Sequence, residues 1–196
     1  MTAALPGSLR PIAPTEIRIE GVVVLARPVH QDPRGLLVET MRADDASVGG
    51  DRFRMTYTSV TVPGEFRDKD RWHLHARQTD RFVVPLGEMI LALHDGRPGS
   101  PTTRRLEVIR MAGPPIHAAG APTKRDVLTY LVTIPPGVHH CIGNLSPAPF
   151  VLQNFPTEYF DATDEGRIPF DSLTVPALGR GFSWDLVDRT TPGTGV

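Results

Sequence analysis

Four side chains of this sequence have the types and the spacing that chemistry needs: His73, His75, Asp80 and His140. His73 and His75 are two positions apart, so on a strand both imidazoles project from the same face. His140 comes shortly after a Pro-Pro-Gly turn at residues 135–137. Three imidazoles and a carboxylate can bind a divalent transition metal, and an imidazole alone can act as a general acid or base. The pair His73 and His75 is therefore a candidate polar site, and Asp80 and His140 are further candidates for its chemistry.

The elements that must position this site are short strands. Glycine and proline, with 18 and 20 residues, are spread along the chain and exclude long helices. Leu86-Gly87 predicts a tight hairpin, and the one helical candidate spans residues 41–48. Apolar and β-branched runs, which are typical of strands, cover residues 21–29, 35–41, 53–62, 81–94, 104–111, 126–134 and 150–155. We therefore expect one all-β domain over residues 15–189, with flexible termini at 1–14 and 190–196.

Composition excludes several classes of partner. The formal net charge is −1, so no global field attracts nucleic acid or an anionic membrane. No apolar run is long enough for a transmembrane helix. Cys141 is the single cysteine and cannot form an internal disulfide, and the first residues lack the layout of a signal peptide. A cytoplasmic protein is the simplest expectation.

The two stretches around the histidines resemble the two sequence motifs of the cupin family. The first motif reads His73, His75, Asp80 and Gly87, and the second reads Pro135, Gly137, His140 and Asn144. The one departure is Asp80, where the family usually carries glutamate. The resemblance implies a cupin jelly-roll β barrel or sandwich, with the three imidazoles lining a pocket between its sheets.

Further segments are similar to the dTDP-4-dehydrorhamnose 3,5-epimerase family within the cupins. They are residues 32–39 (DPRGLLVE), 81–88 (RFVVPLGE), 95–102 (DGRPGSPT) and 157–160 (TEYF). The resemblance covers about residues 21–173, and the Trp72-His73-Leu74-His75 segment marks a divergent subgroup. It implies an isomerase that removes the acidic proton beside the C4 ketone of a nucleotide-linked 6-deoxy-4-keto sugar and reprotonates the opposite face.

The resemblance also implies roles for individual residues. His75 matches the general base, Arg81 matches a lysine that stabilises the enolate, and Asp171 is a candidate for the carboxylate that orients the base. Arg34 and Glu39 match residues that bind the nucleotide. The family forms homodimers in which the N-terminal strands complete the partner's nucleotide site, so we expect a homodimer here as well.

Other positions depart from the family pattern. The acid tyrosine falls on Gln153, and an arginine before the base falls on Trp72, with Arg71 one position away. The polar pair at the nucleotide falls near Met55 and Tyr57. The predicted substrate-binding residues are thus Arg34, Glu39, Arg71, Trp72, His140 and Gln153.

Three functions remain open at this stage. The first is the epimerase or isomerase, which requires no cofactor. The second is a metal-dependent cupin enzyme, with a divalent transition metal bound by His73, His75, Asp80 and His140. The third is a cupin that binds a sugar nucleotide without catalysis, which the missing tyrosine favours.

Overall fold

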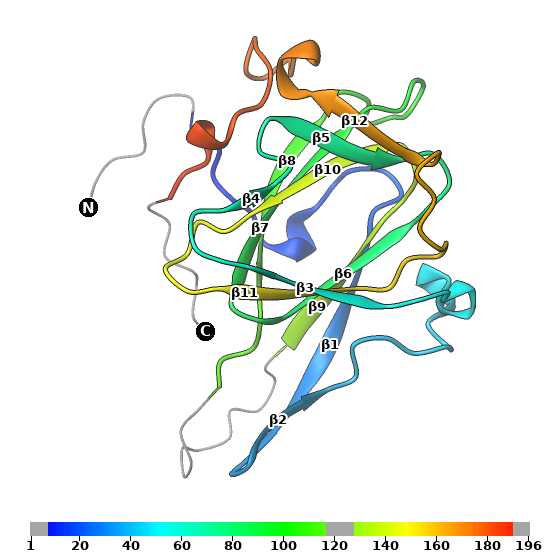
Figure 1. The fold of residues 1–196 in the computed structure, drawn as a ribbon, viewed down its shortest axis with the longest axis vertical. Helices are drawn as coiled ribbons and strands as arrows, with labels where there is room; N and C mark the ends of the chain where they lie inside the picture. The colour runs from blue at the N-terminus through cyan, green and yellow to red at the C-terminus, as the bar shows by residue number, and fades with distance from the viewer. Residues whose placement is uncertain (1–7, 117–127, 190–196) are drawn as a thin grey trace.

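The computed structural model describes residues 8–116 and 128–189, which fold into two antiparallel sheets packed face to face (Figure 1). The first sheet contains, in spatial order, β2 (Gly35–Val38), β1 (Val23–Asp32), β9 (Leu128–Ile134), β6 (Asp80–Leu86), β11 (Phe150–Asn154) and β3 (Tyr57–Thr61). The second contains β12 (Glu165–Pro169), β5 (Arg71–His75), β10 (Val138–Gly143), β7 (Glu88–Asp95) and β8 (Leu106–Ala112), and β4 (Phe66–Arg67) also pairs with β10. The predicted all-β jelly-roll architecture is confirmed.

Five short 3-10 helices complete the elements of the described residues. They are η1 (Pro14–Glu16), η2 (Ala46–Val48), η3 (Gly50–Arg52), η4 (Phe170–Ser172) and η5 (Trp184–Leu186). The segment predicted as a helix at 41–48 contains only the single turn η2. None of the described helices is long and apolar enough to cross a bilayer.

The main apolar core lies between the two sheets. It is formed by alternate residues of facing strands, among them Phe82, Leu91, Ile109, Val132 and Phe150. Gly87 joins β6 to β7 with a φ of +79°, which a glycine adopts without strain, so the predicted hairpin is present. Side chains at even positions of β6 and β10 point into this interior, and the same alternation carries the polar residues described below.

A second apolar cluster covers the outer face of the sheet that contains β5, β10 and β7. Trp72 is fully buried there, and its ring packs against Phe170 and Phe182, with centroids 5.0 and 5.1 Å away. The prediction that Trp72 contacts substrate is therefore wrong, because Trp72 lies on the opposite face of β5 from His73 and His75.

The N-terminal segment joins this outer layer. The Leu9 N–H donates to the Leu186 carbonyl at 2.6 Å, and Ile12 forms a parallel bridge with Ile109. Residues 8–14 therefore belong to the folded unit, which begins earlier than the predicted boundary at residue 15. Residues 1–7 and 190–196, also predicted to be flexible, lie outside the described residues.

Arg81 points away from the interior, toward the loop that carries η2 and η3. Its guanidinium group donates to the Val48 carbonyl at 2.7 Å, to the Phe155 carbonyl at 2.8 Å and to the Gly49 carbonyl. The prediction that Arg81 faces substrate is wrong, because Asp80 and Arg81 are neighbours on a strand and only one of them can point inward. Arg81 instead attaches the 46–52 loop to the sheet.

We expect Arg81→Met to lower the free energy of unfolding by about 2–4 kcal/mol, because a buried carbonyl left without a donor costs about 1–3 kcal/mol. Methionine keeps an unbranched apolar side chain, so the change removes mainly the three hydrogen bonds. Urea unfolding followed by circular dichroism measures the effect.

The matched control for this prediction is Arg52→Met, because Arg52 is exposed in the same loop. It should change the unfolding free energy by no more than about 0.5 kcal/mol. Equal effects of the two substitutions would contradict the assigned role of Arg81.

Candidate active site

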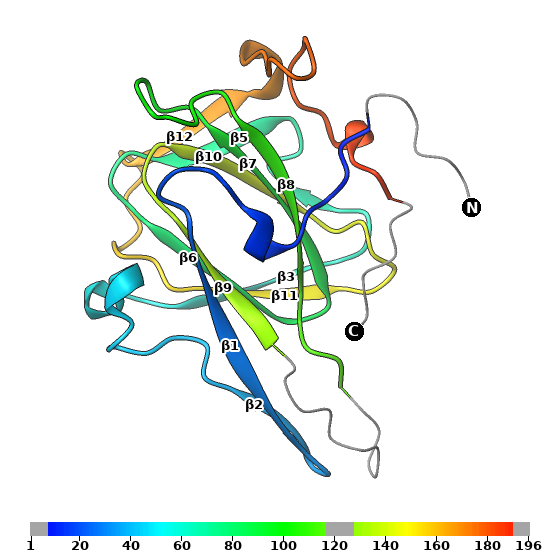
Figure 2. The same ribbon diagram turned by 180° about the vertical axis from the view of Figure 1, so that it is seen from behind.

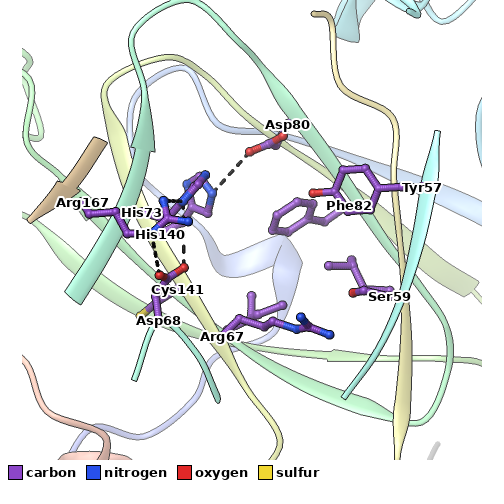
Figure 3. Close-up of a pocket in the computed structure, with 12 residues that line it drawn as sticks. Tyr57, Ser59, Arg67, Asp68, His73, Asp80, Phe82, His140, Cys141 and Arg167 are labelled. Atoms are coloured by element: carbon purple, nitrogen blue, oxygen red, sulfur yellow. Dashed lines mark hydrogen bonds and ion pairs between the residues drawn. The ribbon is translucent and has the colours of Figure 1, made fainter. Parts of the chain in front are cut away.

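A cavity of about 190 Å³ lies between the two sheets (Figure 3). Phe82 and Leu152 contribute apolar surface to it. Its polar lining consists of Tyr57, Ser59, Arg67, Asp68, His73, Asp80, His140 and Arg167. The cavity thus combines imidazoles, carboxylates, guanidinium groups and one phenol in a small space.

Strand register places the histidines together. β5 lies between β12 and β10, and the pairing sets Arg167 of β12 and His140 of β10 on either side of His73. His75 lies two residues along β5 and projects from the same face. One nitrogen of each imidazole lies within 4.8 Å of the others, so His73, His75 and His140 form a three-histidine cluster.

His75 lies between two carboxylates. Its Nδ1 is 3.3 Å from Asp164 Oδ2, and its Nε2 is 3.5 Å from Asp80 Oδ2. The Asp164 carboxylate is fixed by the backbone N–H groups of Arg77 and Gln78, at 2.8 and 3.1 Å. The contact with His75 is too oblique for a full hydrogen bond, but Asp164 is the carboxylate that faces Nδ1. A carboxylate at one ring nitrogen orients the other nitrogen as a general base.

Asp80 is the buried acid of the cavity. Its Oδ1 accepts hydrogen bonds from the Gln78 and Asn154 side-chain amides, at 2.8 and 2.7 Å, and its Oδ2 is 3.3 Å from His140 Nε2. Burial raises the pKa of Asp80, but the hydrogen bond with His140 and the electrostatic interactions with His140 and His75 outweigh burial and lower the pKa to about 2. Asp80 is therefore a carboxylate at neutral pH.

His73 differs from the other two imidazoles because a cation contacts it. Arg167 Nη1 donates to His73 Nδ1, and His73 Nε2 is 2.9 Å from His75 Nε2. Burial, the imidazoles of His140 and His75, and the Arg167 charge together lower the pKa of His73 to about 3. His73 is therefore neutral at physiological pH.

The spacing of the imidazole nitrogens in the three-histidine cluster would suit a metal ion, but the lone pair that His73 would have to provide is not free. A neutral imidazole has one unprotonated nitrogen, and in His73 this is Nδ1, since a guanidinium group can only donate. A metal shared with His75 and His140 would need the lone pair of His73 Nε2. His73 as placed does not fit the predicted role of a metal ligand.

Three predicted substrate-binding residues lie elsewhere. Arg34 is at the tip of the β1–β2 hairpin, where its side chain is 90% exposed and pairs with Asp32. Glu39 follows β2 and pairs with Arg42 at the surface. Arg71 forms an exposed ion pair with Asp70. The hairpin points away from the end of the sheets where β5 and β12 lie (Figure 2), and neither Arg34 nor Glu39 lines the cavity of its own chain.

Two further predictions fall on the wrong residue. Gln153 alternates with Leu152 and Asn154 on β11, so its side chain lies on the outer face of the sheet and does not line the cavity. Asp171 is exposed on η4, and Asp164 takes the predicted place beside His75.

Sequence reasoning missed Asp164, and it named the position of Tyr57 only as one near the nucleotide. Asp164 precedes β12, and the pairing of Glu165 with His75 carries it to the Nδ1 side of the ring. Only the register of β12 against β5 reveals this proximity. Tyr57 lies across the cavity from the histidines (Figure 3). The Asn154 amide donates to its hydroxyl oxygen at 2.9 Å.

Several known proteins are similar to this chain in sequence and in fold. No protein-family model matches the chain. It is 32% identical over 156 residues to a probable low-salt glycan biosynthesis epimerase of Haloferax volcanii, covering 78% of this chain and 89% of the relative. It is 29% identical over 173 residues to a spore coat polysaccharide biosynthesis protein of Bacillus subtilis, covering 87% of this chain and 99% of the relative.

Solved structures agree with these relatives. A dTDP sugar isomerase of Desulfovibrio desulfuricans superposes with a TM-score of 0.68 at 25% identity, over 87% of this chain and 94% of the other. A 4-keto-6-deoxy sugar epimerase of Streptomyces spheroides shares the fold, with a TM-score of 0.62 at 23% identity, over 87% of this chain and 76% of the other. The resemblance seen in the sequence and the enzyme class that it implied are confirmed, and the chain belongs to the dTDP-4-dehydrorhamnose 3,5-epimerase-like family of cupins.

Proposed function

We propose that this protein epimerises or isomerises a nucleotide-linked 4-keto-6-deoxy sugar, with His75 as the general base. The observation that carries the proposal is the placement of His75, whose Nδ1 faces the buried Asp164 while Nε2 lies 2.9 Å from His73 Nε2 and 3.5 Å from Asp80 Oδ2 at the edge of the cavity that these two residues line. The named relatives, a glycan biosynthesis epimerase and a dTDP sugar isomerase, support the substrate class.

The proposed reaction begins with proton transfer from carbon to His75. His75 Nε2 takes the proton beside the ketone, and the electron pair of the broken C–H bond moves to the carbonyl oxygen, which becomes an enolate oxygen. Arg67, which lines the cavity, supplies positive charge in place of Arg81. Asp164 stabilises the imidazolium that forms.

Tyr57 is the proposed acid that returns a proton to the opposite face. Its hydroxyl oxygen accepts from Asn154, which leaves the O–H free to donate into the cavity. Burial and the Asp80 carboxylate raise the pKa of Tyr57, so the phenol stays protonated until it reacts. Tyr57 replaces the donor that the sequence lacks at Gln153.

The family resemblance assigns nucleotide binding to Arg34 and Glu39, which do not line the cavity of their own chain. Arg34 lies at the exposed tip of the β1–β2 hairpin, and Leu37 on the same hairpin is 59% exposed. We propose a cytoplasmic homodimer in which this hairpin packs on the partner, buries Leu37 and brings Arg34 and Glu39 to the partner's cavity.

Deuterium wash-in tests the general base. A dTDP-linked 4-keto-6-deoxy sugar incubated with the enzyme in D₂O should gain deuterium beside the ketone. His75→Asn should reduce the rate by at least about 10²–10⁴-fold, because it removes a positioned base. The affinity for dTDP, measured by calorimetry, should remain within a few-fold of wild type. A chain that binds dTDP without any wash-in would be a binding protein and not an isomerase.

A matched pair of carboxylates provides the control. Asp164→Asn should slow wash-in by about 10²-fold or more, since the amide no longer stabilises the imidazolium. Asp171→Asn alters an exposed residue outside the cavity and should leave the rate unchanged. The reverse ranking would assign the orienting role to Asp171 after all.

Tyr57→Phe should separate proton removal from inversion. His75 can still exchange the proton with solvent on its own face, so deuterium wash-in should persist. The epimerised product, which needs a donor on the other face, should form about 10²-fold more slowly. NMR of the sugar protons measures both quantities in one sample, and equal loss of both would contradict the assignment of Tyr57 as the acid.

The dimer is tested by light scattering. The chain of 21.4 kDa should scatter as a particle of twice that mass at micromolar concentration. Leu37→Glu, which places a charge on the exposed hairpin, should shift the protein toward monomer and weaken dTDP binding. A monomeric wild-type protein with full dTDP affinity would overturn the shared site.

A further inference from the structure

Arg167, His73 and His75 form a continuous row of contacts that ends at a carboxylate. Arg167 lies opposite His73 in the register of β12 and β5, and its Nη1 donates to His73 Nδ1. His73 Nε2 is 2.9 Å from His75 Nε2, and His75 Nδ1 faces Asp164 at 3.3 Å.

The donor-only guanidinium group decides where each proton in this row resides. His73 Nδ1 must accept from Arg167, so the proton of the neutral His73 ring is on Nε2. His73 Nε2–H then donates to His75 Nε2, which must carry a lone pair, and the Gln78 side-chain NH₂, 3.0 Å from the same atom, can likewise only donate to it. The remaining proton of His75 is therefore on Nδ1, where it faces the Asp164 carboxylate.

We infer that Arg167 is a positioning residue that fixes the tautomers of His73 and His75, leaves His75 Nε2 unprotonated, and keeps the three-histidine cluster from binding a divalent metal. The importance of this tautomer for catalysis rests on the proposed function. The tautomers themselves and the exclusion of metal do not, and they can be measured without substrate.

Two further contacts hold Arg167 in this position. Arg167 Nε is 3.1 Å from Asp68 Oδ1, and Nη1 is 3.5 Å from Glu165 Oε2. The guanidinium group therefore stays beside His73 while the substrate site is empty.

Exclusion of metal has two physical causes. A metal at the cluster would need the lone pair of His73 Nε2, which would move the ring proton to Nδ1 and point it at the guanidinium hydrogens. The fixed positive charge of Arg167 also repels a divalent cation at short range. Both obstacles disappear if Arg167 is replaced by an uncharged side chain.

The first test reads the tautomers directly in the full-length protein. With ¹⁵N-labelled histidine, long-range proton–nitrogen NMR correlations should place the His73 proton on Nε2 and the His75 proton on Nδ1. Arg167→Met should abolish the fixed Nε2–H tautomer of His73. Arg67→Met removes the other cavity guanidinium without touching an imidazole and should preserve both tautomers. A wild-type His73 with its proton on Nδ1, or one unaffected by Arg167→Met, would overturn the inference.

The second test measures affinity for Co²⁺ by visible absorption. Arg167→Met should bind Co²⁺ at least about 10²-fold more tightly than wild type, because it frees a ligand and removes a nearby charge. Arg67→Met should change the affinity by less than about tenfold. Equal affinity of wild type and Arg167→Met would overturn the inference.

A double variant identifies the ligand that Arg167 releases. Arg167→Met combined with His73→Asn should lose the gained affinity, because His73 is then missing. If the gain survives in the double variant, the metal binds the freed carboxylates of Asp68 and Glu165, and the proposed blocking of His73 is wrong.

Discussion

The buried carboxylate of Asp80 joins the two sheets at the cavity. One of its oxygens accepts from the amides of Gln78 and Asn154, and the other faces His140 and His75. A buried charge without partners is costly, so the strands that carry Asn154, His140 and His75, and the loop that carries Gln78, must be in place before Asp80 is stabilised. The position of the imidazoles thus depends on Asp80 as much as Asp80 depends on them.

The barrel buries apolar side chains on the outer faces of its sheets as well as in its interior. This additional burial offsets the cost of placing polar groups inside the barrel. The outer cluster around Trp72, Phe182 and Trp184 covers one sheet, and a third cluster around Val83 and Leu131 covers the other. These layers add apolar burial to that of the interior, where part of the space is given to histidines and carboxylates. The active site is therefore supported from outside the barrel as well as from within.

Sequence reasoning predicted the strands and the His73–His75 pair from local patterns, and it added His140 through the resemblance to the two cupin motifs. The alternation of apolar residues indicates strands, and the spacing of His73 and His75 sets a shared face. It misplaced Arg81 because the resemblance assigned both Asp80 and Arg81 to the site, whereas neighbours on a strand point to opposite faces. It missed Asp164 because the register of β12 against β5 is a long-range property that no local pattern contains.

The outer layer also affects how the chain can fold. Leu9 pairs with Val187, so the segment near the beginning of the chain receives its partner only when nearly the whole chain is present. Contacts between residues so distant in sequence form slowly, because a long loop must close first. During synthesis on the ribosome, the face that carries Trp72 must stay uncovered until residues 170–187 have emerged. Folding of this domain can therefore be completed only after residues 170–187 have been synthesised, and until then the apolar face around Trp72 is exposed to aggregation.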